Sequence, residues 1–567
     1  MIPREVPRPV RRTLAYSDMC CPSPDRAARS ARAHFSLGAS SAVIAFAVLI
    51  AGCASARVRA PAPPAPVSHA RPAAEVERAP LPPANPKLPP VPQVDGPLEI
   101  HVAYPHNPNS LIESRDSTFL FGTVGNGSAG LRVNGALVPV WPNGAFLGWV
   151  TVPPVDNQAF DLVAYTATDT ARLRYPVRTL AAQPPRTPTP VPVTKLDTPV
   201  AATLFDDSLA RAVSDTDAII IGRPTPTGTY KWFLFQGTPV AVVEYRGDMA
   251  RVRIDPTQEI WVSRDDVKAT DAAASDVPLA LTEPRITSAS DAVTFSARSA
   301  KPPAYIVEEG DDALTLTVYN STASAALAPP HDSLLSSATQ TRDGTRTVYR
   351  FALTHPIYGY LAQYHDGVFS FAIRRPPKVD AARPLRGQTI VVDPGHPPIG
   401  ATGPTGLWEP VATLAVGLRV RDMLEARGAH VVMTRTGPDP VALGDRPIIA
   451  RRANANALVS IHLNADPDNV NPYRDDGTGT YYFWPHSKPL ASAVQSSLVP
   501  QLGLRSRGVL IQNLALCRPT WFPAVLAEGL FVIMPAEEAA IRTPEYQDAY
   551  ARGIVDGLER YFAGLAR

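Results

Sequence analysis

Proline is the residue that most limits how this chain can fold. The sequence has 62 prolines among 567 residues, and they gather in two stretches, from Arg59 to Pro97 and from Pro184 to Pro192. Proline fixes φ and removes a backbone donor, so such stretches cannot form a packed core. The chain is also longer than one hydrophobic core usually supports. The prolines therefore predict several domains joined by extended, semi-rigid spacers.

The amino-terminal segment has the pattern of an export signal. Arginines precede an apolar run from Ala42 to Ala51, which is too short to span a bilayer as a stable helix. The run leads into Leu49-Ile50-Ala51-Gly52-Cys53, which resembles the bacterial lipobox, whose cysteine is lipidated and becomes the first mature residue. We expect an exported lipoprotein of the cell envelope, anchored to a membrane by Cys53 and lying on the periplasmic face if the cell is Gram-negative. Cleavage as an ordinary signal peptide is the alternative.

Charge and cysteine content exclude two other classes of protein. With 54 Lys and Arg against 52 Asp and Glu, the chain has no basic field that predicts a nucleic-acid partner. Three of the four cysteines lie near the amino terminus and only Cys517 lies in the body of the chain, so no disulfide framework is expected. We interpret Cys517 as a small buried apolar residue.

The middle of the chain has the pattern of short β-strands. Residues 98–182 alternate apolar and polar positions between turns such as Asn134-Gly135, and they resemble an immunoglobulin-like β-sandwich. Residues 200–270 contain about five short strands with aromatic positions, which resemble an SH3-like barrel. Residues 280–377 alternate again, most clearly from Leu314 to Tyr319, and predict a third β-rich domain.

From Leu385 onward the pattern changes to alternating strands and helices. Near-continuous apolar strands are expected at residues 389–392, 430–433, 458–461, 480–483 and 524–527. A helix between the first two has an apolar stripe at Val411, Leu414, Ala415 and Leu418. Strands that are apolar on both faces indicate a mostly parallel sheet flanked by helices, in an α/β domain over residues 386–567.

Four polar side chains are expected at one edge of this sheet. His396, His462 and Glu528 each end a predicted strand, and Glu409 begins the helix after the first strand. Carboxyl ends of parallel strands meet at one edge. Two imidazoles and one carboxylate are a set typical of hydrolytic zinc sites, which leave a position for water. We therefore predict one zinc held by His396, Glu409 and His462, with Glu528 as the general base.

The same motifs, in this order, resemble a known family. They are Asp-Pro-Gly-His396, Glu409, Thr434-Arg435-Thr436, Ser-Ile-His462-x-Asn-Ala and Pro-Ala-Val-Leu-x-Glu528. Together they resemble the zinc-dependent N-acetylmuramoyl-L-alanine amidases of amidase type 3. The resemblance implies a peptidoglycan hydrolase that cuts the amide between N-acetylmuramic acid and the L-alanine of the stem peptide. Pro397-Pro398 stands where the family has glycines, which predicts altered substrate fit with the metal retained.

The resemblance also gives the other regions an expected role. Residues 280–377 resemble the AMIN-like, envelope-targeting domains found beside cell-wall amidases. The whole arrangement is then a lipoprotein signal over 1–53, a Pro/Ala-rich linker over 54–97, three small β-rich domains, and the zinc amidase domain. After His462, the polar stretch from Asp466 to Asp476 predicts a short loop that offers no apolar stripe for an inserted helix.

Several alternatives remain at this level. A histidine at a strand end is usually only a satisfied polar group, Glu528 could pair with an arginine in the core, and Asp393 more often braces a loop than does chemistry. The chain could also be a non-catalytic protein that binds peptidoglycan through its β domains and keeps a degenerate amidase domain. A zinc peptidase acting on stem-peptide cross-links uses the same ligand types.

Overall fold

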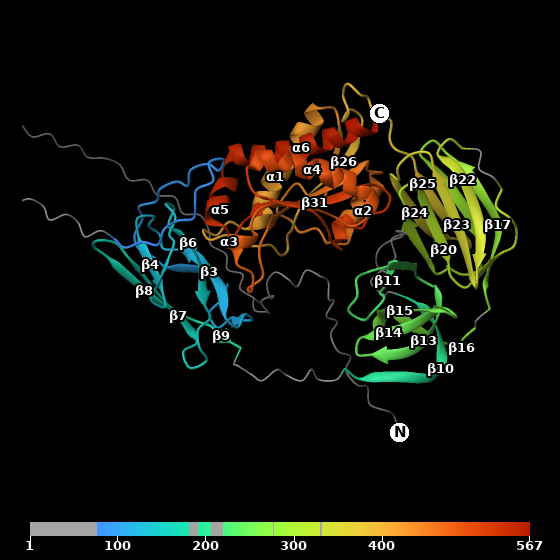
Figure 1. Cartoon of the computed structure of the whole chain (residues 1–567), viewed down its shortest axis with the longest axis horizontal. Coiled ribbons are helices and arrows are strands. Elements are labelled where there is room, and N and C mark those ends of the chain that lie inside the picture. The colour runs from blue at the N-terminus through green and yellow to red at the C-terminus, as the bar shows by residue number, and fades with distance from the viewer. Residues whose placement is uncertain (1–75, 181–190, 206–218, 276, 329–331, 567) are drawn as a thin grey trace, which may run out of the picture.

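The computed structural model of the protein describes residues 76–180, 191–205, 219–275, 277–328 and 332–566. The predicted lipoprotein signal, including Cys53, lies outside the described residues. The chain is multidomain and rich in β-structure, with helices gathered in its carboxyl-terminal part (Figure 1).

A six-stranded sheet forms the centre of the carboxyl-terminal region. Its strand order is β27-β26-β28-β31-β29-β30. The strands are β26 (Thr389–Pro394), β27 (His430–Met433), β28 (Ala457–Asn464), β29 (Thr478–Tyr482), β30 (Ser506–Ile511) and β31 (Ala524–Phe531). All neighbouring pairs run parallel except β29 and β31, so the sheet is mixed with a mostly parallel order.

Helices cover both faces of this sheet. They are α1 (Glu409–Ala426), α2 (Asp445–Arg452), α3 (Pro472–Asp475), α4 (Lys488–Leu502), α5 (Pro535–Ile541) and α6 (Pro544–Leu565), with short 3-10 turns η2 (Pro485–Ser487) and η3 (Ala515–Cys517). Ile390 and Val392 pack in the large core under α1, α4 and α6, while Val391 packs in a smaller core with Ala450 of α2. This alternation explains why the strand is apolar at every position.

Helix α1 is rotated relative to the stripe expected from the sequence. Its buried row is Ala412, Val416, Val420 and Leu424, whereas Val411 is 57% exposed. The helix begins at Glu409, and this side chain turns toward the sheet edge, which fixes the rotation of the whole helix. The predicted stripe at Val411, Leu414, Ala415 and Leu418 is therefore wrong by about one position. Cys517, in contrast, is buried and free, as predicted.

The first β-rich region consists of two sheets around one core (Figure 1). One sheet has the order β1-β3-β6 and the other β5-β4-β7-β8. The strands are β1 (His101–Tyr104), β3 (Ser117–Thr123), β4 (Gly130–Val133), β5 (Ala136–Val138), β6 (Ala145–Thr151), β7 (Ala159–Tyr165) and β8 (Thr170–Pro176), with a short pair β2 (Leu111–Ile112) and β9 (Arg178–Thr179). The region lies beside α3 and α5, at the edge where the parallel strands end (Figure 1).

The spacer predicted over 54–97 is not a free tether in its described part. Residues 76–97 form no helix and no strand, as expected for a proline-rich segment. However, Leu88 and Val91 pack against the large core, and Asn85 Nδ2 donates to the carbonyl of Gly503 at 2.8 Å. Apolar side chains between the prolines thus dock this segment on the carboxyl-terminal region.

The second β-rich region begins earlier than predicted. Its five-stranded sheet has the order β15-β14-β13-β10-β16, and β11 pairs with β12 beside it. The strands are β10 (Val193–Leu204), β11 (Ile219–Gly222), β12 (Trp232–Phe235), β13 (Pro239–Arg246), β14 (Met249–Asp255), β15 (Gln258–Ser263) and β16 (Val267–Ala273), with the turn η1 (Arg264–Asp266). Strand β10 starts at Val193, directly after the prolines, because its residues pair with β13 from the first position onward.

The third β-rich region has two sheets, β21-β17-β18-β25-β24 and β19-β20-β23-β22. The strands are β17 (Leu279–Ser288), β18 (Ala292–Arg298), β19 (Tyr305–Glu309), β20 (Ala313–Val318), β21 (Ser321–Ala323), β22 (Leu335–Asp343), β23 (Arg346–Leu353), β24 (Gly359–His365) and β25 (Val368–Arg374). They enclose an aromatic-rich core. The region lies near α2, at the opposite edge of the six-stranded sheet from the first β-rich region (Figure 1).

Buried polar contacts fasten the third region to the six-stranded sheet. Arg374 is 5% exposed, and its guanidinium donates to the carbonyls of Ala455 at 2.5 Å, Asn454 at 3.1 Å and Trp521 at 3.1 Å. Nearby, Glu309 pairs with the ring of His486 at 2.8 Å, and both side chains are almost completely buried. Such contacts demand a fixed arrangement, because a buried charge without its partners is costly.

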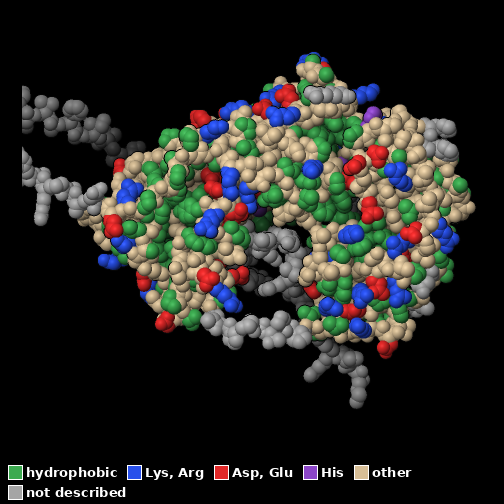
Figure 2. Space-filling view, viewed as in Figure 1, with side chains coloured by type: hydrophobic (Ala, Val, Ile, Leu, Met, Phe, Trp, Pro, Cys, Tyr) green, Lys and Arg blue, Asp and Glu red, His purple; other side chains and the backbone are tan. Residues whose placement is uncertain are grey.

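Charged side chains of both signs lie on the surface of the molecule (Figure 2). On the face seen in Figure 2, acidic and basic side chains are interspersed over all regions, in keeping with the nearly equal charge totals of the sequence. Among the described residues, no helix combines the length and the hydrophobicity needed to cross a membrane.

Replacing Arg374 by alanine tests the docking of the third region. Arg374→Ala leaves three carbonyls without a donor, at a cost of about 2–4 kcal/mol. In scanning calorimetry, we expect the melting temperature of the transition that includes the carboxyl-terminal region to fall by about 5–10 °C. Arg350→Ala is the control, because Arg350 is 51% exposed and pairs weakly with Asp312 at 3.6 Å; it should shift the transition by about 1 °C. Equal shifts for both variants would contradict the anchoring role.

Candidate metal centre

The loop after β26 presents His396. The side chain follows the strand by two residues, and His396 has a left-handed backbone with φ of 59°. Two buried arginines hold this loop by its carbonyls: Arg446 Nη2 donates to His396 O at 2.9 Å, and Arg435 Nη2 donates to Gly395 O at 2.9 Å. A residue in this backbone region needs such support, which is typical of functional sites.

Asp393 braces the same loop from inside the sheet. It is fully buried and accepts hydrogen bonds from Thr434 Oγ1 at 2.5 Å, Ser460 Oγ at 2.6 Å and Arg446 Nη1 at 2.8 Å. With every oxygen occupied by protein donors, Asp393 has a bracing role rather than a chemical one.

Glu409 lies at the first turn of α1, where the helix dipole favours a negative charge. Its two oxygens are held separately: Oε2 accepts from the amide of Ala401 at 3.0 Å, and Oε1 accepts from the amide of Leu463 at 3.0 Å. The loop before α1 is itself held by Glu538 of α5, which accepts from the amides of Thr405 and Leu407. The position of the carboxylate is therefore set from three sides.

His462 lies near the end of β28, with its ring against the loop that bears His396. A Cβ atom placed on Gly395 would lie 2.4 Å from the ring of His462, so only glycine allows this approach. The hydroxyl of Tyr550 donates to the carbonyl of His462 at 3.0 Å. The ring is thereby fixed by packing on one side and the backbone by a hydrogen bond on the other.

The three side chains converge on one point. His396 Nε2 lies 3.1 Å from Glu409 Oε2, and His462 Nδ1 lies 3.1 Å from Glu409 Oε1. All candidate ligand atoms lie within 4.8 Å of one another, and no other cluster of this kind occurs among the described residues. Ligands about 2.1 Å from a tetrahedral zinc are about 3.4 Å apart, so the donor set and its spacing fit zinc.

The charge balance of the site also favours a cation. Burial alone would raise the pKa of Glu409, but the two imidazoles beside it hold its pKa well below the usual range. Glu409 therefore stays ionised although it is only 3% exposed. A buried carboxylate flanked by two imidazole rings is a donor set that suits a divalent metal ion.

Glu528 lies on the neighbouring strand and not at its end, because β31 continues to Phe531. Glu528 is the strand partner of His462. Its Oε2 is buried and has no hydrogen-bond partner. Burial and the charge of Glu409 raise the pKa of Glu528 well above its usual range, and Arg507 opposes this shift. Among the described residues no ion pair to Glu528 occurs, so the alternative of a core arginine pair has no support.

The sequence did not reveal the residues that hold the site in place. Arg446, Glu538 and Tyr550 contact the ligand-bearing backbone, yet each lies on an element with no distinctive motif. Buried charged residues within otherwise apolar helices were the available signal, as in Glu537-Glu538.

Comparison with known proteins places this site in a family. A model of the N-acetylmuramoyl-L-alanine amidase family matches residues 390–560. YqiI, an uncharacterized protein of Bacillus subtilis (strain 168), is 34% identical over 197 residues, which are 34% of this chain and 93% of YqiI. The chain belongs to the N-acetylmuramoyl-L-alanine amidase family. The family predicted from the ordered motifs is thereby confirmed.

Other members of the amidase family match the same region. The probable cell wall amidase LytH of Staphylococcus epidermidis is 34% identical over 188 residues, or 32% of this chain, and the chain spans 61% of the length of LytH. A crystal structure of N-acetylmuramoyl-L-alanine amidase from Clostridium difficile 630 is 33% identical and covers 31% of this chain and 97% of its own, with a TM-score of 0.30. The three β-rich regions lie outside the part matched by the family model.

Metal analysis tests the three-residue cluster. The intact mature chain should bind one zinc, and His462→Ala should weaken zinc affinity by more than about a hundredfold, because a tetrahedral site loses one of three protein ligands. Mass spectrometry after dialysis and competition with a chelator would measure this. His430→Ala is the matched control, since His430 is exposed on β27. Absence of stoichiometric zinc from the wild-type chain would overturn the assignment.

Buried carboxylates beside the site give the stability a pH dependence. Glu537 of α5 accepts from the amide of Phe531 at 2.7 Å, and burial raises its pKa to about 8. As pH rises from about 4.5 to 8, the unfolded chain loses this proton before the folded chain does, so stability falls across that window. Glu537→Gln should flatten the decline in melting temperature between pH 5 and pH 9. Glu545→Gln, an exposed change on α6, should follow the wild type. An unaltered slope in Glu537→Gln would show that Glu537 is ionised in the folded state.

Proposed function

We propose that this chain hydrolyses the amide between N-acetylmuramic acid and the L-alanine of the peptidoglycan stem peptide. The observation that carries the proposal is the convergence of His396, Glu409 and His462 at the edge of the sheet, with Glu528 on the adjoining strand. Membership of the amidase family supports the choice of bond. The relative LytH is named as a probable cell wall amidase.

The roles of the side chains follow from their positions. His396, Glu409 and His462 would hold one zinc, and zinc in such a site supplies Lewis acidity and lowers the pKa of water toward about 7. Glu528 is the strand partner of His462 and has a buried oxygen without a hydrogen-bond partner, so it would accept the proton of the attacking water and deliver it to the departing nitrogen. Burial and the charge of Glu409 raise the pKa of Glu528 well above its usual range, and Arg507 only opposes this rise, so the charge of a bound zinc would be needed to favour the ionised form that a base must have.

Two other functions would use parts of the same structure. A non-catalytic peptidoglycan-binding protein would not need an intact set of ligands with a free carboxylate beside it. A zinc peptidase acting on stem-peptide cross-links would need the same ligands and is separated only by its products. The chemical nature of the released ends therefore decides between the three.

The location of the enzyme is part of the proposal. The sequence before residue 76 supports export and anchoring to a membrane through a lipidated Cys53. The β-rich regions would then bind or orient the enzyme on peptidoglycan in the cell envelope. The balanced net charge gives no reason to expect a nucleic-acid partner.

Glu528→Gln separates catalysis from metal binding. The change removes the proton acceptor and keeps the shape of the side chain, so turnover on purified sacculi should fall by at least about a thousandfold while zinc remains bound. New amino-terminal alanine and free lactyl ends on the glycan would be measured by mass spectrometry. Glu425→Gln, an exposed change on α1, should leave both unchanged. Loss of zinc in Glu528→Gln would instead make Glu528 a ligand, and release of other peptide ends would favour the peptidase.

A further inference from the structure

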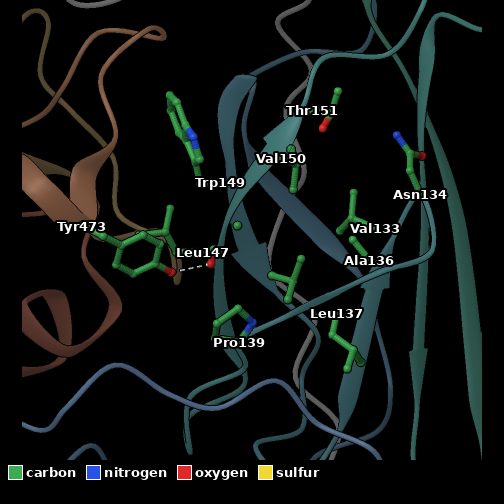
Figure 3. A pocket seen from close by; sticks show the side chains of 12 residues that line it. Val133, Asn134, Ala136, Leu137, Pro139, Leu147, Trp149, Val150, Thr151 and Tyr473 are labelled. Carbon is green, nitrogen blue, oxygen red and sulfur yellow. Dashed lines mark hydrogen bonds between the residues drawn. The ribbon is translucent and has the colours of Figure 1, made fainter. Parts of the chain in front are cut away.

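A pocket lies between the first β-rich region and the catalytic region (Figure 3). Its volume is about 350 Å³, which is within the range of small-molecule sites. It forms where β5 and β6 diverge into different sheets, each as an edge strand. The segments that contain β5 and β6 are joined by the bridge between Val140 and Phe146. Beyond this bridge the two strands move apart. Tyr473 of α3 closes the remaining side.

The lining of the pocket is uncharged and mostly aliphatic, with two aromatic side chains. None of its twelve lining residues is charged, and most are aliphatic. Trp149 and Tyr473 stand on one side and Asn134 on the opposite side (Figure 3). In the part of the chain that the structure describes, the indole N–H of Trp149 and the amide NH₂ of Asn134 donate no hydrogen bond. The pocket thus combines broad apolar faces with unused donors, a combination that suits a polar but uncharged ligand.

The pocket is coupled to the catalytic edge by the loop that follows His462. The hydroxyl of Tyr473 donates to Leu147 O at 2.6 Å. Two residues further along α3, Asp475 pairs with Arg507 at 2.8 Å, and the Arg507 guanidinium lies 5.1 Å from the ring of Phe531 at the end of β31. Contacts therefore run without a break from the pocket to the strand that bears Glu528.

We propose that this pocket binds the glycan strand of peptidoglycan beside the scissile amide. The proposal rests on the proposed function for the identity of the polymer. Stem peptides carry free carboxylates and amines, and the lining offers no charge to pair with them. N-acetylglucosamine, and N-acetylmuramic acid whose lactyl carboxyl is still amidated by the stem peptide, are uncharged sugars. They have apolar ring faces that stack on Trp and Tyr, and they carry hydroxyl and acetamido groups that accept from Trp149 and Asn134.

The proposal implies that the metal centre and the pocket bind different parts of the same glycan strand. The metal centre acts on the amide at one sugar, while the pocket holds a neighbouring part of the same strand. Eleven of the twelve lining residues come from the first β-rich region and Tyr473 comes from α3, so docking of the two completes one side of the pocket. Long glycan strands should therefore be better substrates than single muramyl-peptides, through binding energy gained away from the reacting bond.

Binding to isolated glycan tests the proposal directly. The probe is a linear strand of alternating N-acetylglucosamine and N-acetylmuramic acid freed of stem peptides, with its lactyl carboxylates converted to amides so that it is uncharged. It is titrated into the intact chain by calorimetry. Trp149→Ala should raise the dissociation constant by about tenfold or more, and Trp149→Phe, which keeps an aromatic face, should recover part of the affinity. Leu111→Ala is the control, since Leu111 is 42% exposed and lies outside the pocket. Free stem peptide should not bind.

Enzyme kinetics provide a second test of the glycan-binding proposal. Trp149→Ala should lower kcat/KM on sacculi by about five- to tenfold and leave kcat/KM on a single muramyl-dipeptide within about twofold. Unchanged glycan affinity in Trp149→Ala, equal losses on both substrates, or binding of stem peptide that depends on Trp149 would each overturn the proposal. A wild-type chain that binds glycan yet releases no peptide from either substrate would refute the amidase function and leave the glycan site in place.

Discussion

The catalytic edge depends on one buried carboxylate. Glu409 is 3% exposed, and an ion at that depth is tolerated only when each oxygen is compensated. The amides of Ala401 and Leu463 and the rings of His396 and His462 provide this compensation. These groups come from two segments, the loop after β26 and the end of β28, and Glu409 itself lies on α1, so all three must be in place before the charge can be buried. The requirement explains why so many buried polar contacts support this edge.

The sequence predicted the site better than it predicted the surroundings. His396, Glu409 and His462 could be grouped because carboxyl ends of parallel strands share an edge, and the structure brings the three together. The rotation of α1 could not be predicted from its apolar stripe, because the helix begins at Glu409 and the position of this carboxylate at the candidate metal site sets the rotation of the first turn. Strand β30 was missed because Arg507 and Gly508 interrupt its apolar pattern. The position of Glu528 inside β31 depends on pairing with β28, which no local pattern encodes.

The accessory regions are parts of one assembly with the catalytic sheet. The third region inserts Arg374 among the carbonyls at the start of the strands, and the first region lies beside the loops at their carboxyl ends, where Tyr104 bonds to Asp468. The linkers suggested by proline content predicted separate bodies, because composition reports backbone freedom and not surface complementarity. Docking was visible only as apolar residues within the spacer, such as Leu88 and Val91.

The long-range contacts of the amino-terminal segment have a consequence for biogenesis. Asn85 bonds to Gly503, a partner 418 residues away, and Tyr104 bonds to Asp468, 364 residues away. Synthesis and export deliver the amino-terminal residues first, so their docking surfaces do not yet exist when they emerge. Closing so large a loop is slow relative to local folding. Until the carboxyl-terminal region has been made, the apolar side chains that later dock on it, such as Leu88 and Val91, have no partner surface and are exposed to solvent.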